Sequence, residues 1–185
     1  SGIRLLGTGD MGIGNTTPSS AVGCAITGHT VRDMVGRGTG IDDGKLQRKR
    51  EAVSAGLEQN APDSADGLDV LAKVGGFEIG GIAGCILAAA RHGIPVVLDG
   101  LISTAGALIA DRIAPACRGY MFAGHVSEEP GHRHMLEHLG LAPLLDLGMR
   151  LGEGTGAALA MNILDAAASL NSEVMTFDQA GISLE

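Results

Sequence analysis

A glycine-rich turn near the start of the chain limits the possible folds more than any other feature. It runs from Gly7 to Asn15 with the sequence GTGDMGIGN, and residues 16–20 (TTPSS) follow it. The apolar side chains within 3–6 predict the end of a buried strand, and the apolar run 21–26 predicts a helix with Pro18 in its first turn. Backbone N–H groups that converge at a helix N-terminus favour an anion. The turn therefore predicts a phosphate site, with a purely structural tight turn as the alternative.

Gly7, Gly9 and Gly12 also match the G-x-G-x-x-G pattern of dinucleotide-binding folds. That pattern needs a second strand that ends in an acidic residue about 20 residues further on. Asp33 lies near this distance, but residues 28–36 contain too few apolar side chains for a buried strand. An NAD-dependent oxidoreductase is therefore the weaker interpretation, and we expect no cofactor.

The composition predicts one globular domain over residues 1–185. Hydrophobic residues make up 45% of the chain, yet no apolar run is long enough to cross a membrane, and the start has no signal-peptide pattern. The net charge of -8 argues against nucleic acid as a partner, because phosphate backbones bind basic surfaces. Cys24, Cys85 and Cys117 lack metal-binding spacing, and their odd number predicts reduced, buried thiols in a cytoplasmic protein.

Strands and helices alternate in the predicted order of elements. Short continuous apolar runs predict strands at 94–98, 119–123 and 144–148, and helices are predicted at 43–59, 68–74, 78–91, 130–139 and 157–170, with a further helix that Ser103 or Thr104 caps and that ends at Ile113. This alternation predicts an α/β fold with a Rossmann-like, mostly parallel sheet, flanked by helices. Asp99-Gly100 ends one strand, at the edge where such sheets bind ligands.

A second glycine turn, Gly36-Arg-Gly-Thr-Gly40, precedes a helix for which Asp42 and Asp43 are candidate N-caps. Lys45 and Lys49 lie four residues apart and share one face of that helix. Two interpretations remain open at this point. The lysines either form a solvated basic face, or one of them reaches an anion held by the neighbouring glycine turn.

The helix that Pro130 opens contains His132, His134 and His138. His134 and His138 have the spacing of a zinc-binding helix, but no glutamate lies between them in H-E-x-x-H order. We therefore expect solvated histidines and no metal site.

Glu153 lies between two glycines, directly before the helix predicted at 157–170. One interpretation is an acid that interacts favourably with the helix dipole. The other is a carboxylate held at the ligand edge of the sheet, where it acts as a general base.

Several of these stretches together resemble nicotinate-nucleotide:dimethylbenzimidazole phosphoribosyltransferases. They are GDMGIGNTT at 9–17, GRGTG at 36–40 with Lys49, VLDG at 97–100, RLGEGTGA at 150–157 and the ending TFDQAGIS at 176–183. The resemblance runs along all 185 residues but matches only the C-terminal half of a family member. It therefore implies that the sheet is incomplete because the N-terminal half is absent, which fits a chain that enters its first strand without a methionine.

The resemblance implies an enzyme of cobalamin biosynthesis. Such an enzyme moves the 5-phosphoribosyl group from nicotinate mononucleotide to 5,6-dimethylbenzimidazole or a related azole, which gives α-ribazole 5′-phosphate and nicotinate. No metal is needed to activate the donor, because its leaving group is a positively charged pyridinium.

The resemblance also assigns roles to individual residues. Glu153 corresponds to the proposed base that removes the azole N–H proton. Asp10, one methylene shorter than the Glu that family members usually carry, is a second catalytic candidate. The other implied site residues are Gly12, Ile13, Gly14, Asn15 and Thr16 around the ribose phosphate, Gly38, Thr39, Gly40 and Lys49 at the donor phosphate, Ser127 at the nicotinate end, and Leu151 and Gly152 beside the acceptor.

One alternative belongs to a different functional class. The chain would then be a non-catalytic module that binds a nucleotide phosphate, or a partial subunit that needs another chain to complete its site, and Glu153 would have no catalytic use. In either case we expect small-molecule ligands, no membrane partner and a homodimer, because a strand at the start of the chain leaves a sheet edge to be covered.

Overall fold

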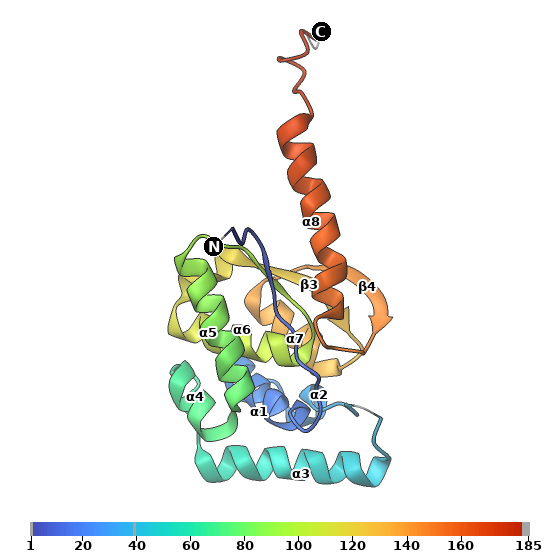
Figure 1. The fold of residues 1–185 in the computed structure, drawn as a ribbon. Helices are drawn as coiled ribbons and strands as arrows, with labels where there is room; N and C mark the ends of the chain where they lie inside the picture. Colours follow the sequence, from blue (N-terminus) through green and yellow to red (C-terminus); the bar gives the residue numbers. More distant parts are fainter. Residues whose placement is uncertain (1, 39, 183–185) are drawn as a thin grey trace.

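The sheet of this protein has four parallel strands in the order β1-β2-β3-β4. In the computed structural model, which describes residues 2–38 and 40–182, the strands are β1 (Leu6–Gly7), β2 (Val96–Leu98), β3 (Met121–Ser127) and β4 (Pro143–Met149). Helices connect them on the outside of the sheet (Figure 1). The predicted α/β fold with a parallel sheet is therefore confirmed.

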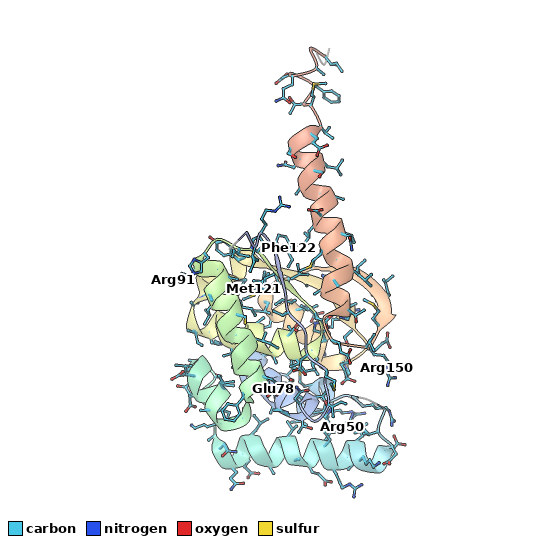
Figure 2. All side chains as sticks on the ribbon, viewed as in Figure 1. Arg50, Glu78, Arg91, Met121, Phe122 and Arg150 are labelled. Atoms are coloured by element: carbon cyan, nitrogen blue, oxygen red, sulfur yellow. The ribbon has the colours of Figure 1, made fainter. Side chains whose placement is uncertain are left out.

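The longest connection lies between β1 and β2. It contains α1 (Thr16–Thr27), α2 (Val31–Met34), α3 (Asp43–Asn60), α4 (Gly67–Val74) and α5 (Phe77–Arg91). The later connections contain α6 (Leu101–Ile113) with the 3-10 helix η1 (Pro115–Tyr120), then α7 (Pro130–Leu139), and α8 (Thr155–Glu173) follows β4. Because the strands are parallel, their carboxyl ends meet at one edge, which Arg150 marks opposite Met121 and Phe122 at the start of β3 (Figure 2).

The two faces of the sheet are covered differently. Val96 and Leu98 of β2 belong to the main core, which α1, α5, α6 and α7 build and in which residues 101–111 are all buried. Val97 lies in a separate small cluster with Ala157 and Ala160 of α8. The outer part of α8 extends away from the rest of the molecule (Figure 1). This second face therefore has a thin cover within the described part of the chain.

Several local predictions are confirmed. Asp42 caps α3, and its Oδ1 accepts a hydrogen bond from the Lys45 N–H at 2.8 Å. Pro18 lies in the first turn of α1, as expected for a residue with a fixed φ. Residues 28–36 form no strand, since α2 occupies part of this stretch, so the second strand required by the dinucleotide pattern is missing there.

Other local predictions are wrong. No buried strand ends at residues 3–6, because β1 is a two-residue edge strand and Ile3 is 55% exposed. Neither Ser103 nor Thr104 caps α6, since Gly100 is its N-cap and Thr104 Oγ1 instead donates to the Gly100 carbonyl from within the helix. The strand predicted at 119–123 begins at Met121 and continues to Ser127, because η1 occupies the residues before it.

All three cysteines are unpaired, as predicted, but they are not all buried. Burial raises the pKa of the Cys24 and Cys117 thiols to about 11. Cys85 is exposed because it lies on the face of α5 that turns away from the core. None of the described helices is long and apolar enough to cross a bilayer.

Candidate active site

Two glycine turns pack directly against each other at the carboxyl edge of the sheet. The first is Gly7–Asn15, and the other, which we call the third glycine turn, is Leu151–Gly156. A Cβ atom on Gly9 would overlap the backbone of Gly154, and a Cβ on Gly152 would lie 2.9 Å from the Asp10 carbonyl oxygen. The Glu153 N–H donates to that same carbonyl at 2.8 Å. Glycine is therefore needed at these positions because backbone meets backbone there.

Asp99, the residue after β2, holds the third glycine turn to the sheet. Its Oδ1 accepts hydrogen bonds from the N–H groups of Gly156 at 2.7 Å and Ala157 at 3.3 Å, and its Oδ2 accepts one from Gly154 at 3.0 Å. These N–H groups lie at the N-terminus of α8, where the helix dipole also favours a negative charge. One carboxylate thus fixes both the start of α8 and the turn that carries Glu153.

The protonation state of Asp99 supports this role. Burial alone would raise its pKa, since only 2% of the residue is exposed. The nearby His125 ring and the N–H groups of Gly154 and Gly156 outweigh burial and hold the pKa below the ordinary value of an aspartate. His125 Nε2 lies 3.4 Å from Asp99 Oδ1 and is buried without a hydrogen-bond partner. Asp99 is therefore a carboxylate at neutral pH.

His132 joins the last residue of β3 to the first turn of α6. The Ser127 N–H donates to its Nδ1 at 2.9 Å, so the neutral ring carries its proton on Nε2, which lies 2.8 Å from Thr104 Oγ1. Thr104 in turn donates to the Gly100 carbonyl at 3.0 Å. Burial, followed by the charge of His125, lowers the pKa of His132 to about 3. The expectation of solvated histidines is wrong for His132, because the register of α7 points it into the core.

A cavity of about 70 Å³ opens between these loops. It is lined by residues that follow all four strands: Asp10, Met11, Gly12, Thr16, Gly38, Asp99, Gly100, Leu101, Ile102, Ser103, His125, Ser127, Glu129, Arg150, Leu151 and Gly152. Seven predicted site residues are among them: Asp10, Gly12, Thr16, Gly38, Ser127, Leu151 and Gly152. Arg150 is one of the lining residues, and its Nη2 is 3.5 Å from the Gly38 carbonyl oxygen.

Lys49 lies behind Thr16 at one wall of this cavity. Its Nζ donates to Thr16 Oγ1 at 2.9 Å and to the Gly36 carbonyl at 3.1 Å. Gly38 lies against the same group, with a left-handed φ of +56° and an N–H that donates to Glu129 Oε1 at 2.7 Å. We call Thr16, Gly38 and Lys49 the anion cradle, because N–H, O–H and ammonium donors converge there. Gly40 is exposed beside it, and Thr39 lies outside the described residues.

The protonation of Lys49 reflects this location. Burial lowers its pKa below the ordinary value of a lysine, while the charge of Glu129 acts in the opposite direction. Lys49 is therefore the half-buried lysine of the pair, whereas Lys45 is exposed and forms a surface ion pair with Asp42 at 3.7 Å. Of the two lysines on this helix face, Lys45 is therefore solvated, and Lys49 is the one that remains a candidate for the predicted anion site.

Asp10 shapes the first glycine turn from within. Its Oδ1 accepts hydrogen bonds from the Gly12 N–H at 2.8 Å and from Asn15 Nδ2 at 2.7 Å. Gly12 and Gly14 both have positive φ, which this turn requires. Ile13 is 70% exposed and does not line the cavity. The Asp10 carboxylate is thus a structural part of the turn, with Oδ2 left for other contacts.

Glu153 has an unusual backbone conformation but does not line the same cavity. Its φ is +61°, in the left-handed region that non-glycine residues rarely adopt. Its side chain is exposed and borders a neighbouring cavity of about 320 Å³, between β1 and α8, with Gly9, Ala157 and Met161. Strained residues cluster at functional sites, so the conformation is a reason to consider a functional role.

A family model described as phosphoribosyltransferase matches residues 1–182. The chain belongs to this phosphoribosyltransferase family. It is 59% identical over 182 residues to a protein of Desulforudis audaxviator and 60% identical over 179 residues to one of Desulforamulus reducens, both named nicotinate-nucleotide–dimethylbenzimidazole phosphoribosyltransferase. The matches cover 98% and 97% of this chain but only 52% and 51% of those proteins. The chain therefore spans about half the length of the curated relatives it matches.

A solved structure has the same fold as this chain. The crystal structure of CobT from Thermus thermophilus superposes with a TM-score of 0.93 at 52% sequence identity. The superposition covers 100% of this chain and 55% of that one. The match therefore extends over the strands and over all three glycine turns.

Little in the sequence indicated several residues of this candidate site. Asp99 was visible as an acid at a strand end, a recognised ligand position, but its three backbone contacts are 55 to 58 residues away. His125, Glu129 and Arg150 carried no spacing signal. Within the described residues, no cluster of His, Cys, Asp or Glu is arranged as metal ligands.

The first prediction concerns Asp99. In Asp99→Asn the amide NH₂ would face a backbone N–H, so at least one buried hydrogen bond and the charge are lost. We expect the free energy of unfolding to fall by about 2–4 kcal/mol, measured by urea denaturation. The control is Asp146→Asn, an exposed carboxylate 3.7 Å from Arg133, which should change stability by less than about 1 kcal/mol. Equal midpoints for both variants would contradict the anchoring role.

Proposed function

We propose that the protein to which this chain belongs transfers the 5-phosphoribosyl group of nicotinate mononucleotide to 5,6-dimethylbenzimidazole or a related azole. The products are α-ribazole 5′-phosphate and nicotinate. The names of the relatives support this reaction. Because the chain spans about half of their length, the activity is proposed for the whole protein and not for this chain alone. The observation that carries it is the cavity with the anion cradle at one wall and the third glycine turn at another.

The proposed reaction needs mainly positioning. The azole nitrogen forms a bond to C1′ with its lone pair, while the bond from C1′ to the pyridinium nitrogen breaks and its electron pair stays with nicotinate. The proton on the other azole nitrogen passes to a base. Holding two reactants in line is worth about 7–11 kcal/mol of the barrier, so a phosphate anchor and one carboxylate supply most of what this chemistry requires.

The donor phosphate is assigned to the anion cradle. Lys49 and Thr16 donate from α3 and α1, and the Gly38 N–H donates from the second glycine turn. Gly12 and Ser127 line the same cavity, and we assign the turn from Gly12 to Asn15 to the ribose and Ser127 to the nicotinate. Charge-assisted hydrogen bonds to phosphate are roughly twice as strong as neutral ones, so the cradle supplies the main anchor.

The azole is assigned to the side of Leu151 and Gly152, with Glu153 as its base. The glycines on both sides of Glu153 leave room for a flat ring where the two cavities adjoin, since Gly152 lines the main cavity and Glu153 and Gly154 line the neighbouring one. Asp10 is the second candidate base, because it lines the main cavity. It also lies next to Glu153, whose N–H donates to the Asp10 backbone carbonyl.

The second prediction tests the base in a full-length protein that contains this chain. Glu153→Gln keeps the shape of the side chain but cannot accept a proton. We expect donor affinity to stay within about twofold and kcat to fall by about 10²–10⁴. Turnover is measured with nicotinate mononucleotide and 5,6-dimethylbenzimidazole at several pH values, and the deficit should shrink at alkaline pH, where the azole ionises unaided. Near-parental kcat at neutral pH would remove Glu153 from catalysis and make Asp10 the next candidate.

A second function is a non-catalytic module that binds a nucleotide phosphate. The observation that favours it is the exposed Glu153 side chain, which borders a different cavity from the anion cradle. Such a module would bind nicotinate mononucleotide without releasing nicotinate, even in the full-length protein with the azole present. The transfer assay therefore separates the two functions.

The partner of the chain is assigned as a second copy of itself. Strand β1 is an edge strand with open cavities of about 370 and 320 Å³ beside it. Large apolar side chains are exposed on β3 and α8, among them Phe122, Leu159 and Ile163. A two-fold contact that buries this surface from both copies would cover the thin face of the sheet. Because none of its cysteines is paired, we assign the protein to the cytoplasm.

The third prediction tests this dimer. At tens of micromolar, sedimentation equilibrium should give twice the 18.7 kDa mass of the chain. Ile163→Glu should shift the population toward the monomer, whereas Arg133→Glu, on the exposed side of α7, should not. A monomer at all concentrations for the parental chain would contradict the assignment.

A further inference from the structure

Glu129 holds its carboxylate in an unexpected place. It is the N-cap residue of α7, yet its side chain makes no capping hydrogen bond with that helix. Instead Oε1 accepts the Gly38 N–H at 2.7 Å, across 91 residues of sequence. A short polar link positions its backbone, because the Glu129 N–H donates to Ser127 Oγ at 3.2 Å. The carboxylate thus reaches from the end of β3 into the second glycine turn.

The groups that surround this carboxylate are those of the anion cradle. Gly38 gives it a hydrogen bond, and its charge raises the pKa of Lys49 against the effect of burial. A Cβ atom on Gly36 would overlap Glu129 Oε2, which shows how closely the carboxylate packs against the turn. The Glu129 carboxylate therefore places a negative charge of the protein itself at the cradle.

We propose that Glu129 is an internal anion of the cradle, which competes with the donor phosphate for the Gly38 N–H and for the charge of Lys49. This rests on the proposed function of the cradle and adds a residue that tunes its affinity. Every anion that binds in the cradle must displace this carboxylate. Ions with few other contacts, such as free phosphate, therefore bind with the lowest net affinity. A phosphate ester such as the donor makes further contacts through its ribose and its nicotinate ring, and these contacts offset the same cost.

The carboxylate has fewer polar partners than one in a structural ion pair, since only Oε1 accepts a hydrogen bond. Its Oε2 is buried without a hydrogen-bond partner, and a carboxylate oxygen in that state is destabilised. The residue as a whole is only half-buried and lines the main cavity, so rotation of its side chain leads toward solvent. No ion pair within 4 Å ties it to Lys49 or Arg150 in the described residues.

The fourth prediction compares two neighbouring carboxylates with inorganic phosphate as the probe. Glu129→Gln keeps an oxygen that accepts the Gly38 N–H but removes the charge, so phosphate should bind this chain about tenfold more tightly, measured by calorimetry. Glu128→Gln removes the same charge one residue away, from an exposed side chain that does not line the cavity, and should change affinity by less than twofold. Lys49→Ala should abolish phosphate binding in either background.

The outcomes separate this inference from the function of the cradle. If Lys49→Ala abolishes binding but Glu129→Gln leaves it unchanged or weaker, the cradle stands and the role of Glu129 is overturned. If Lys49→Ala has no effect, the cradle itself is wrong and the inference falls with it. If Glu128→Gln raised phosphate affinity as much as Glu129→Gln, the effect would be general charge repulsion, and this result would also overturn the proposal.

A second measurement avoids substitution. In the parental chain, the amide resonance of Gly38 should shift on titration with phosphate as its hydrogen bond passes from a carboxylate to a phosphate oxygen. The Gly38 amide should respond at the same phosphate concentration as the calorimetric signal. A Gly38 amide that does not respond at saturating phosphate would show that the carboxylate stays in place, against the proposal.

Discussion

The hydrogen bonds that Asp99 accepts from the backbone of the third glycine turn fix the geometry of the whole ligand edge. The carboxylate joins the end of β2 to the start of α8, and α8 covers the second face of the sheet. The turn that it fixes carries Glu153, whose N–H bonds to Asp10 in the first glycine turn. The positions of two candidate catalytic carboxylates therefore follow from one buried carboxylate whose pKa lies below its usual value.

Backbone groups build most of this site, which explains the composition of the chain. Thirty glycines, three phenylalanines and no tryptophan suit turns that pack against one another at backbone distance. Side chains act mainly by holding these turns. His132 links the end of β3 to α6 as a neutral ring, and Lys49 ties α3 to α1 and to the second glycine turn. The site is thus preorganised by contacts that lie behind the surface a ligand would touch.

The elements that could be predicted from the sequence are those set by neighbours in the chain. The strand at 94–98 and the cap at Asp42 depend on a continuous apolar run and on a side chain that bonds three residues on. The burial of His132 and the contact from Glu129 to Gly38 depend on how α7 packs against distant loops. The spacing of the histidines cannot show which of them faces the core. The glycine turns were visible as a candidate anion site, but which of the two lysines lies beside it depends on the packing of α3 on α1.

The central claim is that this chain binds its ligand through the phosphate. The direct test compares two ligands by calorimetry on the 185-residue chain: nicotinate mononucleotide and nicotinate riboside, which differ only in the phosphate. Two or three charge-assisted hydrogen bonds, at about 1.5–3 kcal/mol each, predict that the nucleotide binds at least about 100-fold more tightly. Equal affinities for the two ligands would contradict the account.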